Sequence, residues 1–182
     1  MTFKDLLIAI LIEYRTRWGR PPNKTRLLKL AYLVDVFHAR RFGRPLLDEP
    51  WVYYLYGPYR FDYDETISAP PFEVEEKDYE GDKTATSVTI GREAATPAVE
   101  IEVKGLIAQA VHEFGTLALN ELLDYVYFET EPMMAAERRK ERLDFSTVQP
   151  DSYYKTLELV IDSKAEERLR KEFRAKVKKL RK

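Results

Sequence analysis

The sequence predicts a predominantly helical α+β domain, in which a helical core carries a small antiparallel sheet and a basic helix follows at the C-terminus. Two long segments near the start have apolar residues at helical spacing, and further such segments fill the second half. Between them lie short runs rich in aromatic and β-branched residues. We expect residues 1–150 to form a single α+β domain and residues 151–182 a C-terminal helix with a basic tail.

The first half is predicted to open with two core helices. Residues 3–14 are apolar nearly all round a helix, which is typical of a buried helix. Asn23 is a good N-cap for a second helix over 24–42, whose apolar stripe is followed by Gly43 as the stop signal. Residues 51–56 are rich in aromatics and favour a strand, which Gly57-Pro58 ends.

A hairpin and three further helices are predicted to follow. Residues 72–79 and 84–90 flank Gly81-Asp82, a plausible hairpin turn. Thr96-Pro97 indicates a helix start, and the helix is expected to run to Phe114. The next helix follows Gly115-Thr116, a short one begins near Pro132 and runs towards Leu143, and a loop covers 144–150.

Composition excludes several classes of protein. The 182 residues are 45% hydrophobic, so a wholly disordered chain is excluded. Absence of cysteine excludes disulfide scaffolds, thiolate metal sites and cysteine nucleophiles. No apolar run reaches the roughly 20 residues of a membrane span. The run 6–12 is followed by Glu13, Arg15 and Arg17, unlike a signal peptide, so we expect a cytoplasmic protein without a membrane partner.

The net charge of -1 conceals strong segregation of charge along the chain. Residues 1–46 carry ten basic and three acidic groups, whereas residues 47–103 carry four basic and fourteen acidic groups. The tail from Lys164 to Lys182 has ten basic and three acidic residues. These segments either face each other within the molecule or attract charged partners, and the basic tail is either a solvated helix face or a phosphate-binding element.

No familiar catalytic or metal-binding motif is present. The seven glycines are never closer than ten residues, which excludes phosphate-binding glycine loops. His38 follows Asp35 by three residues, a spacing that could orient a general base but that also suits a structural pair. Asp62, Asp64 and Glu65 are interpreted as a solvated acidic loop because they lack calcium-loop spacing. We expect no enzyme activity, no cofactor and no metal.

Several segments resemble a known family. The stretch 23–38, NKTRLLKLAYLVDVFH, followed by RFGRP at 41–45, is similar to the opening motif of the Panacea or SocA-like antitoxin domain. The segment WVYYLYGP at 51–58 resembles that family's aromatic strand, and 114–123 with Glu131-Pro132 resembles its second half. The chain departs from the family at Met133, where tryptophan is common, and after Pro58, where a short helix is usual.

This resemblance implies a mostly helical, non-catalytic domain that neutralises a cognate toxin protein encoded beside it. It also implies two further candidate partners, a protease or its unfoldase that would receive the toxin, and operator DNA. Members of the family also occur in phage and mobile elements.

The predicted partner contacts combine tyrosines, the helix motif and an acidic strand. Tyrosines are enriched in binding surfaces, and an acidic hairpin would attract the basic surface of a toxin. The alternative is a nucleic-acid-binding transcriptional regulator that uses the basic segments, which a steep salt dependence of DNA binding would reveal. The residues predicted to contact a partner are Lys29, Tyr32, Tyr54, Tyr56, Tyr59, Glu75, Glu76 and Asp78.

Overall fold

The computed structural model describes residues 1–79, 83–92 and 94–150, without the side chains of 77–79, 83 and 84. The chain divides into two compact units, 1–148 and 149–182, and the first contains all the described helices and strands. The predicted C-terminal helix over 151–182 lies outside the described residues. The helices are α1 (Phe3–Trp18), α2 (Lys24–Phe42), α3 (Tyr63–Ser68), α4 (Ile101–Phe114), α5 (Leu119–Phe128), α6 (Glu131–Ala135) and a 3-10 turn, η1 (Phe145–Thr147).

Helices α1 and α2 begin and end where their capping residues predict. The Thr2 hydroxyl accepts from the Asp5 backbone N–H, and the Asn23 side chain accepts from the Arg26 N–H at 2.7 Å. Gly19 and Gly43 close the two helices in the left-handed conformation, with φ of 63° and 72°, which glycine adopts without steric cost. The predicted bounds of α2 are confirmed.

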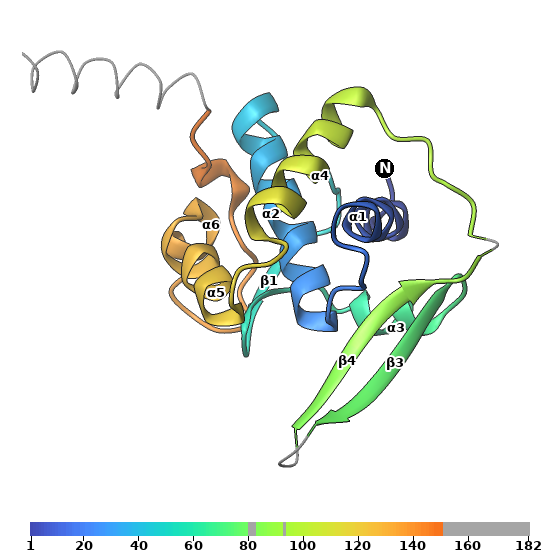
Figure 1. Ribbon diagram of the computed structural model, residues 1–182. Coiled ribbons are helices and arrows are strands. Elements are labelled where there is room, and N and C mark those ends of the chain that lie inside the picture. Colours follow the sequence, from blue (N-terminus) through green and yellow to red (C-terminus); the bar gives the residue numbers. More distant parts are fainter. Residues whose placement is uncertain (80–82, 93, 151–182) are drawn as a thin grey trace, which may run out of the picture. The chain divides into compact units, whose positions relative to one another are not determined.

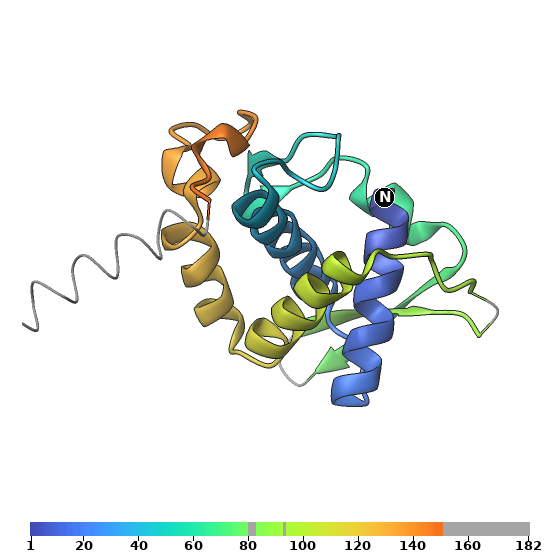
Figure 2. The ribbon, with the colours of Figure 1, turned by 90° about the horizontal axis from the view of Figure 1, so that it is seen from above.

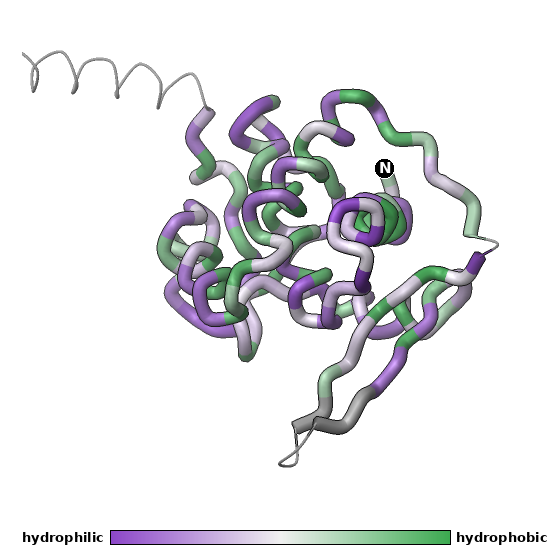
Figure 3. Tube along the Cα trace, viewed as in Figure 1, coloured by the Kyte–Doolittle hydropathy of each residue, from purple (hydrophilic) through white to green (hydrophobic). Residues whose placement is uncertain are grey.

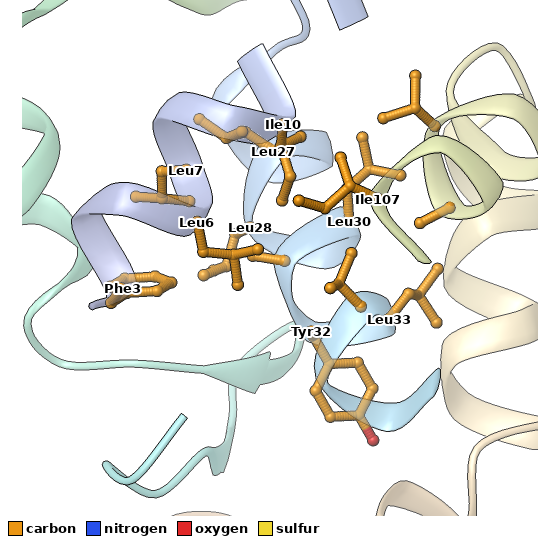
Figure 4. Close-up of a cluster of buried hydrophobic side chains, with 14 of the residues drawn as sticks. Phe3, Leu6, Leu7, Ile10, Leu27, Leu28, Leu30, Tyr32, Leu33 and Ile107 are labelled. Carbon is orange, nitrogen blue, oxygen red and sulfur yellow. The ribbon is translucent and has the colours of Figure 1, made fainter. Parts of the chain in front are cut away.

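The core lies where α1, α2 and α4 pack together (Figures 1 and 2). Figure 4 shows side chains of α1 meeting those of α2, with Ile107 of α4 closing the cluster. Hydrophobic residues concentrate in these helices, whereas strand β3 (Phe72–Tyr79) is largely hydrophilic (Figure 3). Helix α2 is central, and its residues 26–39 are all buried, including its polar ones.

Two separate antiparallel hairpins complete the predicted α+β class, which is confirmed. Strand β1 (Val52–Tyr54) pairs with β2 (Gly57–Tyr59) in a short hairpin whose loop is Leu55-Tyr56. Strand β3 pairs with β4 (Lys83–Ile90) in a long hairpin that projects beyond the helices (Figure 1). The prediction of β3 and β4 is confirmed, but the strand expected over 51–56 is shorter and turns back on itself as β2.

The helix predicted from Pro97 begins only at Ile101, so that prediction was wrong at its start. Residues 94–100 are not helical and run from β4 past α1 to α4 (Figure 1). A non-helical chain covers more distance per residue than a helix, which rises 1.5 Å per residue, and this connection has to span the side of the domain. Val99 packs against the core on the way.

The prediction that a helix runs towards Leu143 was also wrong, because α6 ends at Ala135. The segment that follows pairs with β1 instead. The Tyr53 N–H donates to the Glu141 carbonyl at 2.9 Å, and the Leu143 N–H donates to the Trp51 carbonyl at 2.9 Å. These bonds between distant parts of the chain satisfy backbone groups that a helix would otherwise have satisfied locally.

Helix α3 occupies the segment interpreted as a solvated acidic loop. Its acidic side chains are exposed as expected, but the prediction of a loop was wrong. The helix follows β2 and packs against β3. The short helix expected of the family after Pro58 is therefore present, and three residues separate it from the end of β2. Within the described residues, no helix has the length and apolar composition that a membrane span requires.

Candidate functional site

A group of exposed large apolar side chains lies on and beside the β1–β2 hairpin. Tyr56 is 74% exposed, Phe61 is 65% exposed and Leu55 is 49% exposed. The rings of Tyr54, Tyr59 and Phe61 contact one another, with centroid separations of 5.4 to 5.8 Å. We call this group the aromatic surface, and it consists of Tyr54, Leu55, Tyr56, Tyr59 and Phe61.

The hairpin beneath the aromatic surface is fixed to the body of the domain. Gly57 has φ of 93°, a conformation that side chains disfavour, and a Cβ there would lie 3.4 Å from the Tyr127 ring of α5. Tyr53 stacks edge-on against Tyr127 with the centroids 6.2 Å apart. These contacts place the hairpin that carries the aromatic surface against α5.

Arg60 anchors the end of the aromatic surface that leads into α3. Its side chain is 3% exposed and forms a two-pronged ion pair with Asp62, at 3.0 and 2.7 Å. A further N–H donates to the Glu49 carbonyl at 2.8 Å, and the guanidinium lies 4.4 Å from the Phe3 ring centroid. These contacts hold the Phe61 backbone between two fixed neighbours.

Asp35 organises the chain that leads into β1. Its carboxylate is fully buried and accepts from the backbone N–H groups of Leu46 and Leu47 and from Trp51 Nε1, the last at 2.7 Å. Burial raises the pKa of Asp35, and the three hydrogen bonds oppose that rise. The carboxylate therefore acts as an acceptor for a loop that has no other regular structure.

The arrangement of Asp35 and His38 supports the structural interpretation. His38 Nδ1 lies 2.8 Å from the Arg44 carbonyl, and its ring packs on Phe42. The hydrogen bonds of Asp35 go to the loop and to Trp51, so they do not orient the imidazole. No group of three histidine or acidic side chains is placed to hold a metal ion among the residues that the structure describes.

Two of the predicted contact residues, Lys29 and Tyr32, lie inside the domain. Lys29 is 2% exposed, and Tyr32 is 0% exposed with its hydroxyl 3.0 Å from Thr130 Oγ1. Burial raises the pKa of Tyr32. The Thr130 hydroxyl itself donates to the Val126 carbonyl, so Tyr32 is the donor of this pair. A partner does not reach Tyr32 on the folded domain, and Lys29 is reached only through a pocket described below.

The acidic residues predicted to contact a partner lie on β3. Along the chain, α3 connects the aromatic surface to this strand. Glu75 and Glu76 are exposed, as is Glu73, while the side chain of Asp78 lies outside the described residues. Helix α3 packs on β3, and its Asp64 accepts from the Tyr59 hydroxyl at 2.9 Å. Burial together with Asp64 raises the pKa of Tyr59 to about 12.

Sequence reasoning missed the ion pair that fixes the second half of the domain. Arg40 donates to the Glu131 carboxylate, with its shortest contact 2.9 Å, and to the Glu129 carbonyl at 2.7 Å. The two residues are 91 positions apart, so no local pattern could reveal the pair. The buried Asp35 did have a signal, because a lone carboxylate between Val34 and Val36 in a core helix requires donors from elsewhere.

Comparison with known proteins agrees with the residues that carried the resemblance. The model of the family described as "Antitoxin SocA-like, Panacea domain" matches residues 27–132, which include most of α2, both hairpins, α4 and α5. No curated protein matches the chain, and no solved structure does. The family match covers more than half of the 182 residues. This chain therefore belongs to the SocA-like antitoxin family that carries the Panacea domain.

Proposed function

We propose that this protein is a non-catalytic antitoxin, which binds and neutralises a cognate protein toxin through its aromatic surface. The aromatic surface is the observation that carries the proposal. Tyrosine and phenylalanine supply large contact area with few rotatable bonds, and exposed groups of them mark protein-binding sites more often than isolated residues do. Family membership supports the role, because the matching family is described as an antitoxin domain.

The acidic strand has a different part in this proposal. Charges on an exposed strand that projects from the body act over several ångströms and raise the rate of encounter with a basic protein. They contribute less to the final affinity, because exposed ion pairs are weak in water. The aromatic surface then provides the short-range contact, and β3 the long-range attraction.

The alternative is a regulator that contacts nucleic acid through the basic segment 15–29 and the basic tail. The tail lies outside the described residues, and the segment 15–29 gives this alternative less support. Arg26 is buried and donates to the carbonyls of Phe114 and Leu117, at 2.8 and 2.6 Å. Arg17 pairs with Glu13, and Lys24 pairs with Asp64. Much of the predicted basic segment is therefore already used within the domain and is not free for phosphates.

Co-expression with the product of the adjacent reading frame tests the proposal. We expect that product to stop growth alone and the intact chain to restore growth. The double variant Tyr56→Ser, Phe61→Ser removes the two most exposed rings of the aromatic surface and should not restore growth. Both side chains are exposed, so the substitutions should leave the fold unchanged.

Ile101→Ser is the matched control, because Ile101 is 75% exposed but lies at the start of α4. It should restore growth as well as the unchanged chain. Equal rescue by the double variant would reject the aromatic surface as the binding site. Absence of rescue by the unchanged chain would reject the antitoxin role with this partner.

A further inference from the structure

A pocket of about 340 Å³ lies between the start of α2 and the β1–β2 hairpin. The aromatic surface supplies one side of it, and α2 and α3 supply the remainder. Its position places it within the surface that we propose binds the toxin. The residues that line it are Lys24, Thr25, Leu28, Lys29, Tyr54, Leu55, Tyr56, Gly57, Tyr59, Tyr63 and Asp64.

Lys29 is a buried cation whose charge is poorly compensated. Its ammonium donates to the Pro58 carbonyl at 2.8 Å, which is its single hydrogen bond within the described part of the chain. An ammonium has three N–H donors, and burying one without a carboxylate partner is unfavourable. No described carboxylate forms a salt bridge with it. Burial alone lowers the pKa of Lys29 to about 7.

The other charges around the pocket are already matched. Lys24 Nζ lies 2.6 Å from an Asp64 carboxylate oxygen, and the Tyr59 hydroxyl donates to the other oxygen at 2.9 Å. These contacts, Lys24 first, lower the pKa of Asp64, which keeps this carboxylate ionised and paired. Lys24 and Asp64 cancel each other, and Lys29 is left as the uncompensated charge of the lining when it is protonated.

We propose that this pocket is a carboxylate site, filled in the complex by an aspartate or glutamate side chain of the toxin. This inference rests on the proposed function and adds the chemistry of one contact. A single carboxylate matches the single uncompensated positive charge, and it would accept the N–H donors that Lys29 does not use. A toxin that covers the surrounding aromatic rings would exclude water and strengthen the ion pair.

The pocket and the acidic strand then select opposite charges on the toxin. A basic region faces β3, while an acidic side chain enters the pocket beside the aromatic surface. Two contacts of opposite sign favour one orientation of the partner and disfavour the reversed one. This arrangement gives specificity that neither charge would give alone.

The first arm of the test uses a small probe and needs no toxin. The full chain is titrated with phenylacetate, and with phenylacetamide as an uncharged match, while NMR follows the Lys29 side chain. Phenylacetate should shift the signals of the pocket residues saturably and raise the pKa of Lys29 by at least one unit. Equal effects of the two compounds, or an unchanged pKa, would overturn the carboxylate site.

The second arm identifies the source of the carboxylate in the complex. Lys29→Met should weaken toxin binding at least tenfold, whereas Lys104→Met, which removes an exposed lysine of α4, should leave it unchanged. One toxin Asp→Asn or Glu→Gln variant should weaken binding to the unchanged chain but not to Lys29→Met. Absence of any such coupled residue would overturn the proposed occupant.

The two proposals fail in different ways. If the unchanged chain does not bind the toxin at all, the proposed function fails, and the phenylacetate arm still decides whether the pocket takes a carboxylate. If the unchanged chain binds and Lys29→Met, with its fold confirmed by circular dichroism, binds equally well, the antitoxin role stands and this inference falls.

Discussion

Two buried ionisable groups on α2 differ sharply in how their surroundings satisfy them. Asp35 accepts three hydrogen bonds from the chain around residues 46–51, whereas Lys29, six positions earlier, has one backbone carbonyl. Both are almost completely shielded from water. Burial alone therefore does not define a structural role. Asp35 is explained by the fold it holds, while Lys29 costs stability that the isolated domain does not recover.

The largest effect on stability is expected when Asp35 is replaced. Asp35→Ala leaves the N–H groups of Leu46 and Leu47 and the Trp51 indole without their acceptor. We expect the free energy of unfolding to fall by about 3 kcal/mol or more, since each unsatisfied buried donor costs about 1–3 kcal/mol. Urea unfolding measures this, with Asp35→Asn, which keeps one oxygen, as the milder variant. A loss below about 1 kcal/mol would contradict the assigned role.

The next prediction is a pH dependence of stability that arises from Lys29. The unfolded chain keeps Lys29 protonated up to its ordinary pKa of 10.5, while the folded domain releases that proton near pH 7. Above pH 7 the unfolded state therefore binds more protons, and stability rises with pH. The gain attributable to Lys29 is about 2 kcal/mol between pH 7 and pH 9.

Lys29→Met isolates that contribution. Its free energy of unfolding should be at least equal to that of the unchanged chain at pH 6, and it should lack the rise above pH 7. Urea unfolding of both chains at pH 6, 7, 8 and 9 supplies the comparison. Parallel pH profiles of the two chains would show that Lys29 is not the buried cation that the structure indicates.

A smaller effect is expected at the hairpin that Lys29 holds. Gly57→Ala places a side chain at φ of 93° and against the Tyr127 ring, so the hairpin must adjust. We expect a loss of about 1–2 kcal/mol in thermal or urea unfolding, because positive φ is strained for L-residues. Gly105→Ala is the matched control, since it lies within α4 with open space around its Cβ position. It should be neutral or slightly stabilising.

The smallest effect on stability, and a large one on association, is expected on β3. Reversing Glu73, Glu75 and Glu76 to lysine changes exposed charges and should alter unfolding by less than about 1 kcal/mol. Stopped-flow association with the toxin should slow about tenfold at low salt and much less at high salt. Unchanged association at low salt would reject the acidic strand as the docking element.

Local signals in the sequence predicted the elements that depend on local interactions. Asn23 and Gly43 gave both ends of α2, and the two runs that flank Gly81-Asp82 gave β3 and β4. The failures have a common physical cause. Residues 140–143 pair with β1, which lies about ninety positions earlier, and residues 94–100 stay non-helical to cross the domain. Neither the pairing with β1 nor the course of residues 94–100 can be inferred from the residues nearby in the sequence.

The same limit applies to the candidate site. Tyr56 was predicted as a contact and is the most exposed tyrosine of the aromatic surface. Lys29 and Tyr32 belong to the helix motif that resembles the family, and both were predicted to lie on a face that contacts a partner. That face is covered by the β1–β2 hairpin and by Thr130, elements brought there by long-range packing. Sequence identified the right helix but could not show which of its sides remains open.

Hydrogen exchange of the domain with and without bound toxin shows whether the toxin binds the aromatic surface. We expect toxin binding to slow exchange of backbone amides in residues 52–61, which carry the aromatic surface, and to leave amides on the exposed side of α4 unchanged. Protection concentrated on α4, with residues 52–61 exchanging as in the free domain, would contradict this expectation.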